Sequence, residues 1–250
     1  AFHPGLQVRS IAAGLPGLRR TVVAPFLESD PNLGGIPRGV SLGDYCINVD
    51  NPLTFVQLPF DHPVYILYSS GTTGKPKAIV HGAGGTLLQH LKEHLLYCDT
   101  RAGERIFYFT TCGWMMWNWL VSSLGVGATV VLYEGNPGYP TMERLWQLAA
   151  DTRLHIFGTS AKYLAACAQE NLHPGRDHDL RTLRCICSTG SPLSADLFRW
   201  TYANVKEDLQ LASISGGTDI VSCFVLGNPL LPVHAGEIQC AGLGMDVQAF

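Results

Sequence analysis

Short apolar segments alternate with amphipathic segments from Val64 onward, and this alternation constrains the fold more than any other feature of the sequence. Runs rich in β-branched and aromatic residues predict strands at 64–68, 105–110, 128–133, 155–159, 184–189, 209–215 and 220–227. Helical periodicity predicts helices between them, at 84–98, 115–124, 141–152, 161–171 and 194–205. Strands that alternate with helices form a layered α/β structure with parallel strand pairs. Ligands of such sheets bind beyond the carboxyl ends of the strands, here at Ser69, Gly158, Thr189 and Ser215.

The segment before Val64 is less regular. It holds one clear strand pattern, 21–27, followed by connections rich in proline and glycine. We expect 1–63 to be a connecting portion of a large domain whose partners lie upstream, and 64–250 to be the core of that domain. The chain begins with Ala1 rather than Met and stops inside a strand-like alternation at Phe250, so we expect both ends to be cuts in a longer protein.

The composition excludes several classes of protein. With 46% hydrophobic and 15% charged residues, the chain is expected to fold rather than to be disordered. A net charge of −3 without a Lys/Arg run gives no electrostatic basis for binding nucleic acid or an anionic membrane. The eight cysteines form no CxxC pair, which favours reduced, buried thiols in a cytosolic protein. No secretory leader opens the sequence.

The apolar stretch 114–133 is about as long as a membrane span. Polar residues and glycines interrupt it, at Asn118, Ser122, Ser123, Gly125 and Gly127. We therefore expect a core helix followed by a buried strand and no membrane span.

A run of hydroxyl, glycine and lysine residues follows the strand predicted at 64–68. It reads Ser69, Ser70, Gly71, Thr72, Thr73, Gly74, Lys75, Pro76 and Lys77. Exposed backbone N–H groups, hydroxyls and ammonium groups in one short loop favour an anion, most naturally phosphate. The loop is not a Walker A motif, because only two residues separate its glycines. The alternative interpretation is a solvated turn.

The order of residues 68–77, YSSGTTGKPK, resembles the signature loop of the adenylate-forming superfamily, which includes acyl-CoA synthetases, luciferases and peptide-synthetase adenylation domains. Three more motifs follow in that superfamily's order: CGWMMWNW at 112–119, STGSPL at 188–193 and SGGTD at 215–219. The whole of 64–250 resembles the acetoacetyl-CoA synthetase branch nearly residue for residue, and 21–63 resembles it more loosely.

The resemblance implies a fold and a reaction. The chain would be part of the large N-terminal domain of an adenylate-forming enzyme, with layered sheets flanked by helices and the small C-terminal domain absent. The substrates would be acetoacetate, ATP and CoA, with Mg²⁺. The carboxylate would attack the α-phosphorus of ATP and release pyrophosphate, and the thiol of CoA would then displace AMP. Lipid synthesis from ketone bodies in the cytosol is the implied setting.

The family's essential lysine, its ribose-binding aspartate and its hinge match nothing in this sequence, so the chain by itself is expected to be inactive. Two alternatives stay open. One is a synthetase for another short-chain acid, and the other is a truncated product that does not catalyse.

The resemblance also implies roles for individual residues. Thr73 and Lys77 would grip the β- and γ-phosphates, Thr218 would bond the α-phosphate and Asp219 would bind Mg²⁺; these four are the candidate catalytic residues. Most of the superfamily has Glu where Asp219 stands. The other candidate nucleotide-binding residues are Ser69, Ser70, Gly71, Thr72, Gly74, Lys75, Gly190, Ser191, Pro192, Ser215 and Gly217.

The candidate acid-binding residues are Trp114, Met115, Met116, Thr189 and Gly216. By resemblance, acetyl-CoA synthetases have Trp at the position of Gly216, which closes the pocket just beyond a methyl group. Glycine leaves the pocket open for a four-carbon keto acid, and the Met thioethers can adapt to its shape. Replacing Gly216 with Trp is expected to shift preference from acetoacetate to acetate.

Three histidines near these motifs have less certain roles. His90 and His94 are four residues apart on a predicted helix, but no third ligand accompanies them, so a solvated or capping face is favoured over a zinc site. For His81, packing and a substrate role are equally open.

Overall fold

The computed structural model of the chain describes residues 4–26, 29–46, 52–69 and 74–248. The chain divides into two units, 1–57 and 58–250. Each unit is described by itself.

The first unit contains a small parallel strand pair. Strand β1 (Thr21–Val23) pairs with β2 (Gly39–Ser41), and helices α1 (Pro4–Ala13) and α2 (Leu42–Tyr45) complete the unit. The Ser41 hydroxyl accepts a hydrogen bond from the backbone N–H of Asp44 and so caps α2. Of the strand predicted at 21–27, residues Thr21–Val23 form β1, and Leu27 lies outside the described residues.

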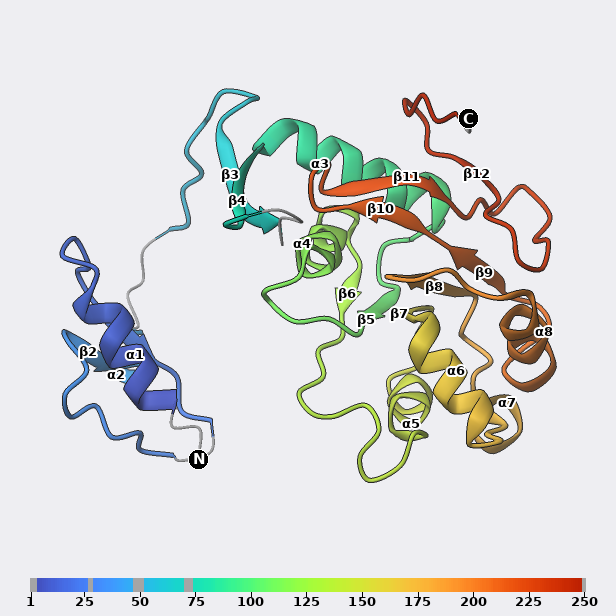
Figure 1. Ribbon diagram of the computed structural model, residues 1–250, viewed down its shortest axis with the longest axis horizontal. Coiled ribbons are helices and arrows are strands. Elements are labelled where there is room, and N and C mark those ends of the chain that lie inside the picture. Colours follow the sequence, from blue (N-terminus) through green and yellow to red (C-terminus); the bar gives the residue numbers. More distant parts are fainter. Residues whose placement is uncertain (1–3, 27–28, 47–51, 70–73, 249–250) are drawn as a thin grey trace. The chain divides into compact units, whose positions relative to one another are not determined.

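The second unit is built on a parallel sheet of five strands in the order β6-β5-β7-β8-β9. The strands are β5 (Arg105–Tyr108), β6 (Thr129–Val130), β7 (Ile156–Ser160), β8 (Cys185–Thr189) and β9 (Gln210–Ser213). The helices that connect them are α4 (Met115–Ser122), α5 (Arg144–Asp151), α6 (Ala161–Gln169), α7 (Pro174–Asp177) and α8 (Ala195–Asn204), with a 3₁₀ turn at Ser123–Val126. Figure 1 shows these helices around the sheet. The predicted alternation is confirmed here, although the strand expected at 128–133 is only two residues long.

The two faces of this sheet pack against different helices because side chains alternate along each strand. Phe107, Phe157, Ile186 and Leu211 lie in register across four strands and join the buried residues of α5, α6 and α8 in one core. On the opposite face, Tyr108 and the residues in register with it pack against α4. The sheet is therefore covered on both sides, as parallel sheets require.

Gly158 shows how closely the core is packed. It is the partner of Tyr108 on the neighbouring strand, and a Cβ atom at this position would lie 2.0 Å from the Tyr108 ring. The position requires glycine because the ring occupies the space of a side chain. Gly158 is thus a packing residue of the sheet.

The strand predicted at 64–68 does not belong to the parallel series, and that part of the prediction was wrong. Strand β3 (Pro63–Ser69) pairs antiparallel with β4 (Lys77–Gly82), with Ser69 opposite Lys77. A parallel neighbour needs a crossover of about a dozen residues, and the connection from Ser69 to Lys77 is too short for one. Strand β4 was not predicted.

A long helix and a small antiparallel sheet also belong to the second unit. Helix α3 (Ala83–Lys92) continues into a π-helical turn, η1 (Glu93–Tyr97). Strands β10 (Ser215–Gly217), β11 (Ser222–Leu226) and β12 (Cys240–Ala241) form a three-stranded antiparallel sheet. In the part of the chain that the structure describes, none of the helices has the length and apolar character needed to cross a membrane.

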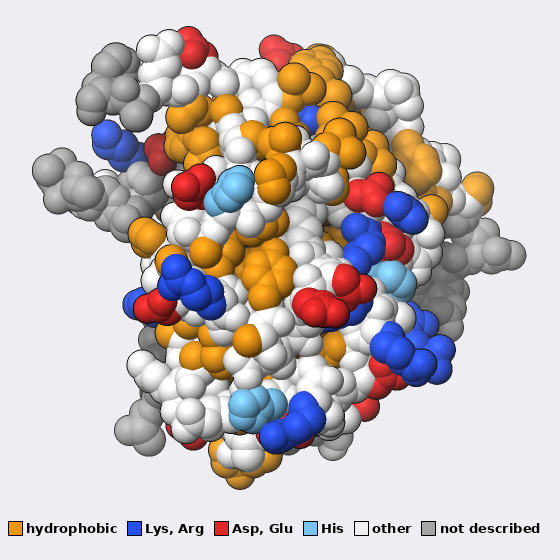
Figure 2. Space-filling model, turned by 90° about the vertical axis from the view of Figure 1, so that its right-hand side faces the viewer, with side chains coloured by type: hydrophobic (Ala, Val, Ile, Leu, Met, Phe, Trp, Pro, Cys, Tyr) orange, Lys and Arg blue, Asp and Glu red, His pale blue; other side chains and the backbone are white. Residues whose placement is uncertain are grey.

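Basic and acidic side chains lie next to one another on the face drawn in Figure 2. Short-range ion pairs such as Arg181–Asp179 and Arg199–Asp196 are largely exposed to solvent. Exposed pairs of this kind contribute little to stability, so the second unit depends mainly on its two-sided core.

Candidate active site

A cavity of about 560 Å³ lies at the carboxyl ends of β8 and β9. Residues of α4, η1, β10 and β11 form its other walls. This is the edge at which parallel α/β sheets bind ligands. The cavity lies entirely in the second unit.

Three of the predicted motifs meet at this cavity. The residues that follow β8, those of β10 and its turn, and those that begin α4 all line it. They are Thr189, Gly190, Ser191, Pro192, Ser215, Gly216, Gly217, Thr218, Trp114, Met115 and Met116. The segments are far apart in the sequence, so the parallel sheet is what brings these residues together.

The other predicted residues lie away from the cavity lining or outside the described part of the chain. Ser69, Gly74, Lys75 and Lys77 flank the turn between β3 and β4, and both lysines are exposed. Asp219 is exposed in the turn that joins β10 to β11. Four residues of the phosphate loop lie outside the described residues: Ser70, Gly71, Thr72 and Thr73.

Hydrogen bonds fix the strand ends at the cavity rim. The Thr189 hydroxyl donates to the carbonyl oxygen of Ile214 at 2.9 Å, and the Ile214 N–H donates to the carbonyl oxygen of Ser188 at 2.9 Å. Gly190 then turns the chain with a φ of +90°, a region that favours glycine. The rim is therefore a defined backbone surface.

Gly216 lies where β10 and β11 approach closely. A Cβ atom at this position would lie 2.2 Å from the Ser222 carbonyl oxygen and 2.6 Å from Cys223 Cα. The close approach of the two strands is thus a structural reason for glycine at this position. Any larger residue here has to displace β11.

The π-helical turn η1 places two side chains in the cavity wall. The N–H of Cys98 donates to the carbonyl oxygen of Glu93 at 3.0 Å, which is the i to i+5 bond of a π-helix. In a regular α-helix, with 3.6 residues per turn, side chains five residues apart point in different directions. The wider turn lets both Glu93 and Cys98 line the cavity.

Glu93 is a buried carboxylate, 3% exposed, at the centre of a hydrogen-bond network. Its Oε1 accepts from Gln89 Nε2 at 3.0 Å, from Cys223 Sγ at 3.3 Å and from the hydroxyl of Ser222. Its Oε2 accepts from Trp119 Nε1 at 2.9 Å. Donors from α3, α4 and β11 therefore converge on one side chain.

No lysine or arginine pairs with Glu93 among the described residues. Hydrogen-bond donors alone therefore offset the cost of burying this carboxyl group, and each of them has to be well placed. Glu93 could not be predicted from the sequence, because a single glutamate on an amphipathic helix resembles a solvent-facing residue. The π-helical turn that brings it to the cavity has no local sequence signal.

The histidines of this region are buried, so the expected solvated face for His90 and His94 was wrong. Each donates from Nε2 to a backbone carbonyl oxygen: His81 to Thr218 at 2.9 Å, His90 to Val221 at 2.6 Å and His94 to Trp119 at 2.9 Å. Two of these bonds attach the turn between β10 and β11 to β4 and α3. His81 therefore has a positioning contact next to the candidate phosphate-binding residue Thr218.

Burial controls the ionisation of His94. It lowers the pKa of the imidazole from 6.5 to about 4, against a smaller opposing effect of the neighbouring Cys98. The Nδ1 atom is buried and has no hydrogen-bond partner among the described residues. Protonation would thus place a charge where nothing accepts its hydrogen bond, and His94 stays neutral at physiological pH.

We expect acidification from pH 6.5 to about pH 4 to destabilise the fold through His94. Above 6.5 the side chain is neutral in both the folded and the unfolded state. Between the two pKa values only the unfolded state binds the proton, so the free energy of unfolding falls by about 1.4 kcal/mol per pH unit for this group. Urea unfolding across this pH range measures how steeply the free energy of unfolding changes with pH. We expect a smaller slope for His94→Gln than for the wild type. Equal slopes would contradict the assignment.

The sequence that builds this cavity matches a known enzyme family. Residues 23–243 fit the sequence pattern described as AMP-binding enzyme. The chain belongs to the family of AMP-binding enzymes. The resemblance predicted from the four motifs is therefore confirmed at the level of the family.

Individual AMP-binding enzymes are closely similar to this chain. It is 56% identical over 246 residues to an acetoacetyl-coenzyme A synthetase of Rhizobium meliloti (strain 1021). The match covers 98% of the chain and 38% of that relative. It is 48% identical over 272 residues to a malonamoyl-CoA synthetase of Penicillium aethiopicum. That match covers 100% of the chain and 38% of the relative.

A solved AMP-binding enzyme confirms the predicted α/β fold. The structure of acetoacetyl-CoA synthetase from Streptomyces lividans matches with a TM-score of 0.89 and 45% identity, over 97% of this chain and 37% of that one. The chain thus spans about 38% of the length of the curated relatives it matches.

Proposed function

We propose that this chain forms the nucleotide- and acid-binding part of an ATP-dependent acid–thiol ligase that converts acetoacetate and CoA to acetoacetyl-CoA, AMP and pyrophosphate. The observation that carries the proposal is the convergence of three separate motifs on one cavity at the carboxyl edge of the sheet. The 56% identity to an acetoacetyl-coenzyme A synthetase supports the choice of acid. We place the reaction in the cytosol, in lipid synthesis from ketone bodies.

The nucleotide would lie along the rim of the cavity. Gly190, Ser191 and Pro192 would hold the adenine, since the +90° φ of Gly190 exposes backbone at this point. Thr218 would bond the α-phosphate, with its position set by the hydrogen bond from His81. Lys75 and Lys77, which are exposed beside β4, would meet the outer phosphates together with the loop that precedes them.

Mg²⁺ is the metal that this chemistry implies, and Asp219 suits it. Its carboxylate is exposed in the turn after Thr218, and no basic residue pairs with it among the described residues. Mg²⁺ usually binds through one or two carboxylates plus the phosphates of a nucleotide. When bound, it would neutralise phosphate charge.

The reaction needs no covalent enzyme nucleophile. A carboxylate oxygen of the acid forms a bond to the α-phosphorus and pyrophosphate leaves; the CoA sulfur then bonds to the acyl carbon and AMP leaves. The protein contributes orientation and charge neutralisation. Trp114, Met115, Met116, Thr189 and Gly216 would enclose the acyl chain.

Glu93 places a buried carboxyl group in the pocket wall. A second carboxylate on the substrate would lie near it and would find no lysine or arginine among the described residues that line the cavity. The proposed substrate therefore has one carboxylate and an uncharged tail, as acetoacetate does. The identity to a malonamoyl-CoA synthetase supports a second candidate, an acid with a terminal amide in place of the methyl ketone.

An exchange assay between ATP and labelled pyrophosphate tests the proposal. The complete protein encoded by the gene that contains this sequence is supplied in turn with acetoacetate, malonamate, acetate, butyrate, malonate and succinate. We expect acetoacetate to give the fastest exchange and the two dicarboxylates to give at least tenfold less. If acetate, butyrate or malonamate gave faster exchange, that acid would be the substrate in place of acetoacetate. If no acid supported exchange, the proposed ligase activity would be rejected.

A further inference from the structure

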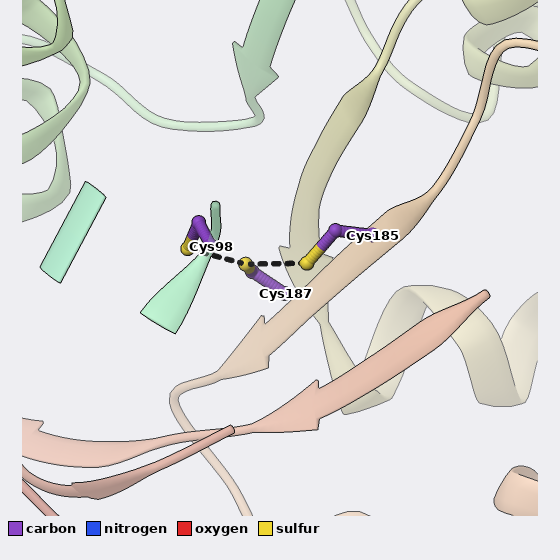
Figure 3. Close-up of side chains that lie close together, drawn as sticks. All are labelled: Cys98, Cys185 and Cys187. Carbon is purple, nitrogen blue, oxygen red and sulfur yellow. Dashed lines mark hydrogen bonds between the residues drawn. The ribbon is translucent and has the colours of Figure 1, made fainter. Parts of the chain in front are cut away.

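Three buried cysteines meet below the cavity wall. Cys187 Sγ lies 3.7 Å from Cys185 Sγ and 3.8 Å from Cys98 Sγ, and all three sulfur atoms lie within 4.8 Å of one another. Figure 3 shows Cys187 between the other two. We call Cys98, Cys185 and Cys187 the thiol cluster.

The fold explains why these thiols converge. Cys185 and Cys187 are two residues apart on β8, so both point to the same face of the sheet. Cys98 comes from the end of the π-helical turn η1, which packs on that face. The three thiols therefore come from two elements, β8 and the end of η1, without any local CxxC motif.

The cluster can be reached from the cavity. Cys185 and Cys187 are fully buried, but Cys98 is one of the cavity-lining residues. Beside it, Met115, Met116 and Cys223 make the same wall rich in sulfur. A small thiophilic molecule that entered the cavity would meet Cys98 before the two fully buried thiols of the cluster.

The surrounding charge selects the kind of ion. The basic side chain next to the cluster, Arg184, is already paired with Glu104 at 2.8 Å, and Glu93 adds to the same wall a carboxyl group that has no basic partner among the described residues. A divalent ion on three thiolates would leave a net negative charge buried beside Glu93. A trivalent centre on three thiolates is neutral and avoids the cost of burying a charge.

The spacing also suits a single central atom. A centre bonded to three sulfurs at about 2.3 Å, the length of a zinc–sulfur bond, holds them about 3.7 Å apart at tetrahedral angles and somewhat closer at the narrower angles of a pyramidal trivalent centre. The two closest separations in the cluster are 3.7 and 3.8 Å. The third pair, Cys98 and Cys185, lies within 4.8 Å, so these two sulfurs would approach each other when a central atom binds.

We propose that the thiol cluster is a binding site for trivalent arsenic, with Cys98, Cys185 and Cys187 as its three ligands. Arsenous acid, As(OH)₃, would exchange its three As–O bonds for three As–S bonds, and the three thiol protons would leave in three water molecules. The oxidation state of arsenic and sulfur does not change. This inference is independent of the proposed ligase activity.

The test uses the protein with arsenite in the presence of excess glutathione, which competes for arsenic as a single thiol. We expect native mass spectrometry to find one arsenic per chain, and X-ray absorption to find three sulfur neighbours and no oxygen. Binding should be slow, because the two fully buried thiols require local opening. An arsenic centre with an oxygen neighbour, or no binding, overturns the proposal.

Serine variants identify the ligands, since serine keeps the size of cysteine but binds soft ions poorly. Cys98→Ser and Cys187→Ser should each weaken binding at least 100-fold. Cys167→Ser is the matched control, because Cys167 is also buried but lies in the core on the opposite face of the sheet. Its binding should stay within twofold of wild type. Equal loss in the control, or retained binding in both cluster variants, contradicts the assignment.

Discussion

Replacing Glu93 with leucine is expected to lower the free energy of unfolding by about 4 kcal/mol, since a buried donor left without an acceptor costs about 1–3 kcal/mol. The substitution removes the acceptor shared by Gln89, Trp119, Ser222 and Cys223. Replacing a buried charge with an apolar residue can also stabilise a protein when its partners are replaced too. Here the donors remain in place, so the loss should prevail.

Urea unfolding monitored by circular dichroism measures the effect. Glu93→Gln keeps one acceptor oxygen and should lose about half as much stability as Glu93→Leu. Glu170→Gln serves as the control, because Glu170 is exposed at the end of α6 and should change stability by less than about 0.5 kcal/mol. If Glu93→Leu were as stable as wild type, the network would not hold α3, α4 and β11 together.

The layered sheet could be predicted because its signal is local and repeated. Each strand of the series, such as 105–108 or 185–189, carries β-branched or aromatic residues between helical segments. The residues at the strand ends followed from the topology, since parallel strands bring Thr189 and Ser215 to one edge. Of the four predicted strand-end positions, Thr189 and Ser215 line the cavity, whereas Ser69 and Gly158 do not.

The features that could not be predicted depend on tertiary packing. The spacing of His90 and His94 shows that they share a helix face, but it does not show whether that face is buried. The π-helical turn contacts residues that are distant in the sequence: Glu93 accepts a hydrogen bond from Ser222, and Cys98 contacts Cys187. The pairing of Ser69 with Lys77 depends on the length of a loop rather than on hydrophobic pattern.

The proposed effect of Gly216 on substrate choice has to be measured as a ratio of activities toward two acids, because substitution at Gly216 also displaces strand β11. A Cβ atom at this position already meets the backbone of Ser222 and Cys223, so any substitution displaces the strand. Because Cys223 donates to Glu93, this displacement also reaches the polar network of the wall. Activity toward every acid is therefore expected to fall in any Gly216 variant.

Gly216→Trp should nevertheless shift the balance between acids by at least tenfold toward acetate, because pocket-size discrimination of one or two carbons is worth about 10–200-fold. The measurement is the ratio of kcat/KM for acetate to that for acetoacetate in the complete protein. Gly216→Ala is the matched control, since it introduces the same backbone contact without an indole wall. Its ratio should stay within about threefold of wild type. An unchanged ratio in Gly216→Trp, or an equal shift in Gly216→Ala, would mean that the open end of the pocket is not set at Gly216.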